Sequence, residues 1–252
     1  MSILKNLQIK YKNKPFTQSI YKYLSTEQMN ILKKAMLQYG FRLFIKSLWN
    51  NLNNGIDQHQ KKKKLTEYLN FEKEKQYFEL LHTWDIDYSL RQICVNEKMK
   101  YDIFFSFILG EYLFEKFTIP YMVDVRIENL TYGGDLDLVS FYKNKLLGIE
   151  IKTSPPINIH LKEISAFIER SFILSDWNHV FLMDSTLRLE DKIIPMLEES
   201  LFYRNGSSSF IHHPVMRIQN QLFHIPPNIY VSNTAPALSS KIKIILSAIS
   251  YN

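Results

Sequence analysis

A β-hairpin is predicted by residues 133–154, which read GGDLDLVSFYKNKLLGIEIKTS. Acidic and apolar residues alternate from Asp135 to Tyr142, a polar turn follows at residues 143–145, and residues 146–152 run back. Alternation of this kind is typical of a strand that packs one face against a core. We therefore expect two antiparallel strands joined by a short turn.

The charged residues of this hairpin are expected to gather on one side. Strict alternation places Asp135, Asp137 and Val139 on one face of the first strand, opposite its leucines. In the second strand Glu150 and Lys152 share a face, opposite two isoleucines. The hairpin can thus bring Asp137, Glu150 and Lys152 to one edge of the sheet.

Two carboxylates beside one ammonium group indicate a binding site. On strands otherwise built of Leu, Ile and Val such charges are costly to bury, and a divalent cation relieves the repulsion between the carboxylates. Carboxylate oxygens suit Mg²⁺ or Mn²⁺. A water molecule whose pKa is lowered by the metal can attack a phosphodiester. Lys152 would orient that water or help to deprotonate it, and would offset charge on the phosphate.

These residues resemble a known nuclease signature. Asp137 followed by Glu150-Ile151-Lys152 resembles the motif of the PD-(D/E)xK nuclease superfamily, with GDLDLV at residues 134–139 as its lead-in. The superfamily also carries an acidic residue on the helix before the hairpin, and Glu111 in GEYL lies at that place. The pattern is most similar to archaeal Holliday-junction resolvases and their bacterial relatives, and type II restriction enzymes share the same core. The resemblance covers residues 101–185.

The resemblance also implies roles for single residues. Asp137, Glu150 and the main-chain carbonyl of Ile151 would hold Mg²⁺ or Mn²⁺, and Glu111 would bind a second metal or a metal-bound water. Asp135 is the alternative metal ligand, and Lys152 would position the nucleophile. The implied catalytic set is Glu111, Asp137, Glu150 and Lys152.

The sequence departs from the family pattern at one element. Many relatives carry a Gln on the helix after the lysine, whereas residues 157–175 contain none and offer Ser165, Glu169 and Arg170 instead. Glu115, one helical turn after Glu111, is the substitute for Glu111. A purely structural alternative is a solvent-exposed hairpin with two acidic residues and one basic residue on its wet face.

Composition narrows the class of protein. The 252 residues carry a formal net charge of +6, which suits a polyanionic partner such as DNA. The single cysteine, Cys94, excludes an internal disulfide, and no membrane-spanning stretch or signal peptide is recognisable. We expect a cytoplasmic protein. No Walker, GxGxxG or GxSxG motif is present, so no organic cofactor is expected.

The flanks of the hairpin suggest two domains. Residues 1–100 read as a mainly helical region, with residues 1–14 as a basic flexible arm, and would serve in DNA binding or dimerisation. The run Lys61–Lys64 has two interpretations, a phosphate contact or a solvated helix start. Residues 101–252 would form the nuclease core with a C-terminal extension. Its α/β, restriction-endonuclease-like fold would have a central mixed sheet of four to five strands flanked by helices.

The sequence therefore predicts a Mg²⁺-dependent DNA endonuclease that acts as a homodimer. It would be either specific for DNA structure, like a junction resolvase, or a restriction-type enzyme. The alternative from another class is a catalytically silent nucleic-acid-binding or scaffold protein that retains the nuclease fold.

Overall fold

The computed structural model describes residues 9–11, 16–54, 69–130, 133–205 and 214–251. They form two compact units. One comprises residues 13–108, and the other comprises residues 1–12 and 109–252. The division falls inside helix α6 (Tyr101–Phe117), which contributes residues to both. The run Lys61–Lys64 lies outside the described residues. Among the described residues, no helix is long and apolar enough to cross a membrane.

The unit of residues 13–108 is helical. Its helices before α6 are α1 (Phe16–Tyr23), α2 (Thr26–Met36), α3 (Tyr39–Asn53), α4 (Phe71–Thr83) and α5 (Ile86–Asn96). Ser25 and Gln28 form a capping box at the start of α2. At the other end of α2, buried Arg42 donates to the carbonyls of Met36 (2.8 Å) and Leu37 (3.0 Å), which satisfies acceptors that the helix leaves open. Trp49 stacks on Phe104. The predicted helical character of this region is confirmed.

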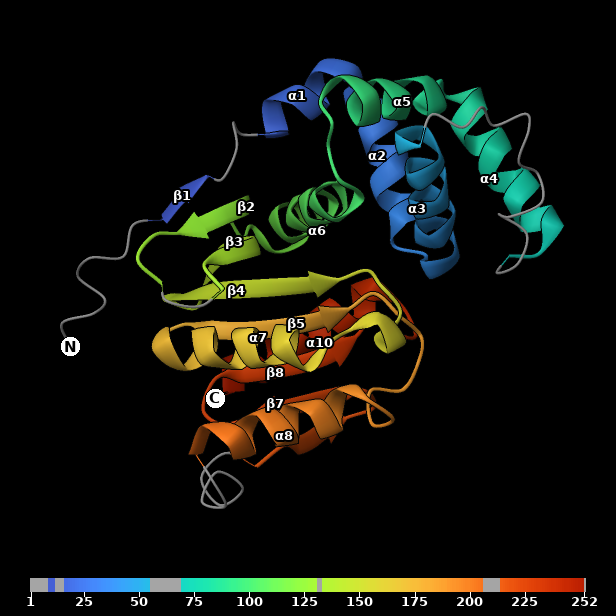
Figure 1. Ribbon diagram of the computed structural model, residues 1–252. Helices are drawn as coiled ribbons and strands as arrows, with labels where there is room; N and C mark the ends of the chain where they lie inside the picture. The colour runs from blue at the N-terminus through green and yellow to red at the C-terminus, as the bar shows by residue number, and fades with distance from the viewer. Residues whose placement is uncertain (1–8, 12–15, 55–68, 131–132, 206–213, 252) are drawn as a thin grey trace. The chain divides into compact units, whose positions relative to one another are not determined.

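The second unit is built on a mixed β-sheet (Figure 1). Eight strands are present in the described residues, in the order β1-β2-β3-β4-β5-β8-β7-β6. Their bounds are β1 Ile9–Tyr11, β2 Tyr121–Ile127, β3 Asp135–Tyr142, β4 Lys145–Lys152, β5 Asn178–Met183, β6 Met216–Gln219, β7 Leu222–Ile225 and β8 Ile229–Asn233. The pairs β4–β5 and β5–β8 are parallel, and the other neighbours are antiparallel.

The predicted hairpin is confirmed as β3 and β4. Its turn residues Lys143 and Asn144 both have positive φ, 52° and 62°, which is the backbone of a type I′ turn. This turn twists in the same sense as the strands it joins, so it fixes the register of the hairpin.

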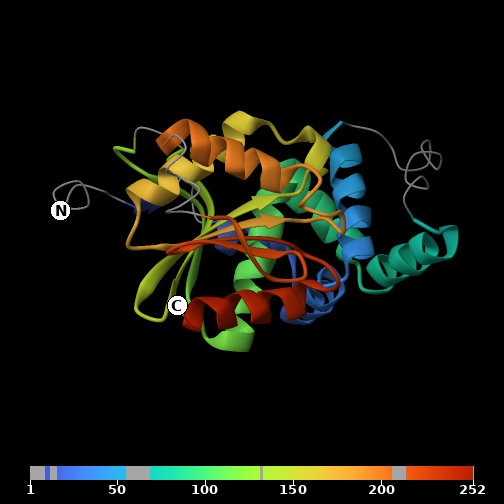
Figure 2. The same cartoon turned by 90° about the horizontal axis from the view of Figure 1, so that it is seen from below.

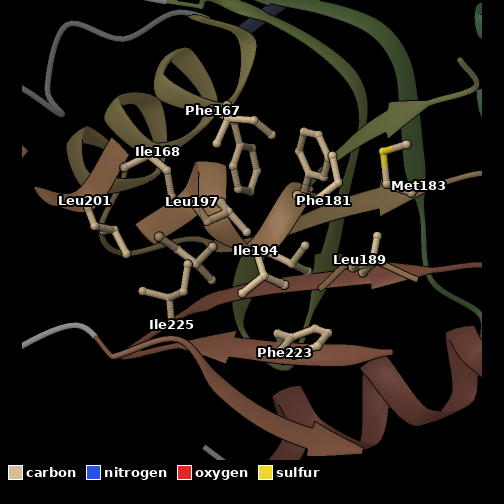
Figure 3. Close-up of a cluster of buried hydrophobic side chains, with 14 of the residues drawn as sticks. Phe167, Ile168, Phe181, Met183, Leu189, Ile194, Leu197, Leu201, Phe223 and Ile225 are labelled. Atoms are coloured by element: carbon tan, nitrogen blue, oxygen red, sulfur yellow. The ribbon is translucent and has the colours of Figure 1, made fainter. Parts of the chain in front are cut away.

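Helices cover both faces of the sheet. The crossover after β4 consists of a 3₁₀ turn (Pro156–Asn158) and α7 (Leu161–Ile173), and β5 leads to α8 (Ile193–Asn205). Figure 2 shows α7 and α8 on one side of the sheet and α10 (Leu238–Tyr251) on the other. Beneath α7 and α8, fifteen buried apolar side chains form one cluster (Figure 3). Thirteen come from the two helices and strands β5, β7 and β8, and two, Ile159 and Leu189, come from the segments that precede the helices.

Two expectations from the sequence are wrong. The sheet has eight strands within the described part of the chain, instead of four or five. Three of the additional strands have only three or four residues, too few for an alternating pattern to be recognised. The expected flexible arm also contains β1, which pairs with β2, and Lys10 forms an ion pair with Glu128 at 2.9 Å.

Candidate active site

Asp137 and Glu150 lie at the end of the β3–β4 ladder. Leu138 pairs with Ile149, so Asp137 and Glu150 occupy the next pair of positions. At this point the Ile151 N–H donates a hydrogen bond to the side chain of Asp137, with Oδ2 at 2.6 Å. The carboxylate thus takes the place of a main-chain carbonyl in the ladder. The register thus places Asp137 and Glu150 at neighbouring positions on adjacent strands.

The alternation of β3 is interrupted at Asp137. Asp124, which faces Asp137 in the β2–β3 register, has a φ of 51°, an unusual value for a residue other than glycine. Val139 pairs with Gly148, and a Cβ on Gly148 would lie 3.2 Å from Leu136 Cδ2. Leu136 and Val139 also belong to one buried cluster. The expectation that they lie on opposite faces is therefore wrong, because the strand rotates between them.

Arg170 on α7 fixes Glu150 from the side of the helix. Its Nη2 donates to Glu150 Oε2 at 2.8 Å, and its Nη1 donates to the carbonyls of Gly133 (2.8 Å) and Asp135 (3.0 Å). The side chain is 4% exposed. One guanidinium group therefore joins the crossover helix to both strands of the hairpin.

Lys152 lies between two carboxylates. Its Nζ is 3.0 Å from Glu150 Oε1 and 2.8 Å from Glu163 Oε2. Glu163 is the third residue of α7, and its Oε1 accepts a hydrogen bond from the His160 N–H at 3.1 Å. The charges alternate along the series Arg170, Glu150, Lys152, Glu163.

The neighbours of Lys152 keep it charged. Burial lowers the pKa of the Lys152 ammonium, but the charges and hydrogen bonds of Glu150 and Glu163 outweigh burial and raise it above the usual value. For the Glu163 carboxyl, burial raises the pKa, whereas the contacts with Lys152 and His160 lower it. The net shift of the Glu163 pKa is downward. Lys152 is thus a cation in this arrangement, which suits it to stabilise negative charge rather than to accept a proton.

Glu111 is buried at the place predicted on α6, where it accepts a hydrogen bond from the Tyr121 hydroxyl. The preceding Gly110 packs directly against the Tyr121 ring, and a Cβ at that position would overlap the ring. Gly110 therefore allows β2 to approach α6 closely enough for the contact. Glu115, the substitute for Glu111, is exposed.

His179 is a buried neighbour of the charged group that the sequence did not single out. Its Nε2 lies 2.9 Å from the Leu174 carbonyl, and its ring stacks on Trp177. Burial, together with the positive charge of Arg170, lowers the pKa of His179 to about 4, although the contact with Leu174 acts in the opposite direction. The imidazole is therefore neutral at neutral pH.

The available donor atoms are oxygens, the type of ligand that Mg²⁺ prefers. Asp137 and Glu150 supply carboxylate oxygens from adjacent strands, and the Ile151 carbonyl directly follows Glu150 in the sequence. The described residues contain no group of three His, Cys, Asp or Glu side chains arranged to hold a metal ion. A cation held by Asp137 and Glu150 would need water to complete its coordination. Metal ligation by Asp137, Glu150 and the Ile151 carbonyl stays a prediction, as does ligation by Glu111 or Asp135.

Arg170 and Glu163 are the residues that sequence analysis did not assign to the site. Arg170 was noted only as a residue of the helix that lacks the expected Gln. A usable signal was the spacing of Glu163 and Arg170, two turns apart on one helix that directly follows Lys152.

Comparison with known proteins identifies no family. No protein-family model and no curated protein matches the sequence. The solved structure of protein VC1899 from Vibrio cholerae is similar at a TM-score of 0.45 and 13% identity, covering 77% of this chain and 53% of that chain. Can2 from Sulfobacillus thermosulfidooxidans, solved with cyclic tetra-adenylate, gives 0.38 and 15%, covering 77% and 50%. The chain spans about half the length of each. Because both TM-scores are below 0.5, neither structure establishes a shared fold.

Proposed function

We propose that this protein is a Mg²⁺-dependent nuclease that hydrolyses phosphodiester bonds in DNA. The observation that carries the proposal is the arrangement of Asp137, Glu150 and Lys152. Asp137 and Glu150 occupy neighbouring positions where one strand ladder ends, and the Lys152 ammonium contacts Glu150. The net charge of +6 supports a polyanionic substrate.

Each of these residues has a distinct task in the proposed reaction. Asp137 and Glu150 would hold the cation, and the hydrogen bond from the Ile151 N–H orients the Asp137 carboxylate. Mg²⁺, when bound, supplies a Lewis acid for the phosphodiester. Lys152 has a raised pKa, which favours a role in offsetting charge on the phosphate over a role as general base.

The proposed substrate is duplex DNA or a DNA junction, and the proposed active form is a homodimer. Two copies related by a two-fold axis can each cut one strand of a substrate with matching symmetry. Discrete fragments from a long linear duplex would identify a restriction-type enzyme. Cleavage confined to a four-way junction would identify a resolvase-like enzyme.

A catalytically silent scaffold is the second candidate, and one observation favours it. Both oxygens of Glu150 already contact cationic side chains, Lys152 and Arg170. A protein that used this charged group only to join α7 to the hairpin would need the same contacts.

Cleavage assays with matched variants separate the two candidates. Purified protein is incubated with plasmid, linear duplex, flap, single-stranded and junction DNA in Mg²⁺ or Mn²⁺. Asp137→Asn keeps an acceptor for the Ile151 N–H but removes the charge, and Lys152→Met keeps most of the aliphatic stem. We expect each to lower the cleavage rate by about 100-fold or more. Lys145→Met, an exposed change on the same strand, should have no effect. Absence of cleavage on every substrate would refute the nuclease.

A further inference from the structure

The two cations that contact Glu150 are held in different ways. Arg170 is 4% exposed and donates to three acceptors, of which two are main-chain carbonyls. Lys152 is 20% exposed. Besides Glu150 it contacts a second acceptor, Glu163, at the shorter distance of 2.8 Å. Lys152 is therefore the cation that can leave Glu150 and still keep a charged partner.

A metal ion at Glu150 makes this difference important. Both carboxylate oxygens of Glu150 are within 3.0 Å of a cationic nitrogen. A divalent cation that binds Glu150 would repel these two cationic groups and compete with their contacts. Displacing Arg170 would leave its buried guanidinium without its carboxylate partner, which is unfavourable. Displacing Lys152 from Oε1 leaves the ammonium bound to Glu163.

We propose that Glu163 is a positioning residue that holds the Lys152 ammonium beside the active site when Glu150 turns its Oε1 to the metal. The inference rests on the proposed nuclease function and extends it to a residue outside the signature. Glu163 itself would contact neither the metal nor the substrate. It would act through Lys152, by supplying the contact that Lys152 loses.

The position of Glu163 suits this task. Its Oε1 accepts a hydrogen bond from the His160 N–H at the start of α7, so its Oε2 remains directed at Lys152. Because Gln also forms a capping box, Glu163→Gln can keep the helix cap while removing the charge that holds Lys152.

Glu169 provides a matched control on the same helix. Its side chain is 33% exposed, as is that of Glu163, and it pairs with Arg204 at 3.2 Å. Glu169→Gln thus removes one charge from α7 without touching Lys152. Both variants should unfold cooperatively, with similar and small losses of stability, because each removes one partly exposed ion pair.

The test measures Mn²⁺ binding without DNA by calorimetry and electron paramagnetic resonance. We expect Glu163→Gln to weaken Mn²⁺ binding about five- to tenfold, because Lys152 then competes for Glu150 without a second acceptor. Glu169→Gln should leave binding unchanged. At saturating Mn²⁺, DNA cleavage by Glu163→Gln should stay reduced, because Lys152 is no longer held.

A double-mutant cycle separates action through Lys152 from a general loss of negative charge. In a Lys152→Met background, Glu163→Gln should no longer weaken Mn²⁺ binding. An equal loss in both backgrounds, or no loss in either, would overturn the inference and leave the nuclease proposal intact. If the unmodified protein binds no Mn²⁺, both fail.

Discussion

Two groups of side chains lie between α7 and the sheet, and we call them the apolar interior and the charged interior. One is the apolar cluster under α7 and α8, where Phe167 packs on Phe181 with ring centroids 5.1 Å apart. The other is the series of charges Arg170, Glu150, Lys152 and Glu163. They meet on α7, where the Arg170 guanidinium lies 5.8 Å from the centre of the Phe167 ring.

The two interiors differ in how specifically their members are paired. Apolar contacts are not directional, and a cluster of this size tolerates exchanges that keep its volume. In the charged series each donor has particular acceptors, so one substitution leaves a defined group without its partner. The apolar interior should therefore control the stability of this unit, and the charged interior should control the proposed chemistry.

The largest loss of stability is expected from Phe181→Ala in the apolar cluster. The side chain is fully buried against Phe167, so its truncation removes apolar burial and leaves a cavity. We expect a loss of about 3–5 kcal/mol in the free energy of unfolding, measured by urea denaturation. A loss no larger than that of a surface substitution would contradict the assigned packing.

The next largest effect is expected from His179, which should make the free energy of unfolding depend on pH. Its folded-state pKa of about 4 lies below the unfolded value, so the native state binds fewer protons than the unfolded state between these values. His179 therefore contributes about 3 kcal/mol to the free energy of unfolding above about pH 6.5. This contribution is lost as the pH falls towards 4. His179→Gln should flatten the stability profile in this window. An unchanged slope would assign the acid sensitivity to other groups.

A smaller loss is expected from Arg170→Met in the charged interior. Methionine keeps an unbranched apolar stem near Phe167 but leaves Glu150 and two carbonyls without their donor. Lys152 still compensates part of the charge of Glu150. We expect a loss of about 2–3 kcal/mol in unfolding free energy. Adding Glu150→Gln should recover part of it, because the uncompensated charge is then removed. A further, additive loss would contradict a coupled pair.

The smallest effect is expected at the exposed pair Glu169–Arg204, with side chains 33% and 30% exposed. Glu169→Gln should cost less than about 1 kcal/mol, because water and salt screen such pairs. Measured beside Arg170→Met, it shows how much burial contributes to an ion pair on the same helix. Equal losses of unfolding free energy for Glu169→Gln and Arg170→Met would contradict the expected difference between the exposed and the buried ion pair.

The sequence predicted what depends on local pattern. The hairpin followed from alternation over Asp135–Tyr142 and from the short polar turn expected at residues 143–145, and α6 followed from its continuous apolar run. Because register depends on the turn, the neighbouring positions of Asp137 and Glu150 could also be expected.

The contacts of Arg170 could not be predicted in the same way. Two of its acceptors are the carbonyls of Gly133 and Asp135, and no side-chain pattern marks a main-chain acceptor. The rotation of β3 beside Asp137 also escaped prediction, because the left-handed φ of Asp124 lies on a different strand. Features that depend on the meeting of distant segments require the folded structure.

The three acceptors of Arg170 have a consequence for the order of folding. Gly133 and Asp135 lie just before and at the start of β3, and Glu150 lies near the end of β4, whereas Arg170 belongs to α7, which follows both strands in the sequence. A peptide limited to the two strands would contain Asp137, Glu150 and Lys152 but would lack the group that sets the Glu150 rotamer. During synthesis, the proposed metal affinity should therefore be acquired only after α7 has emerged and docked.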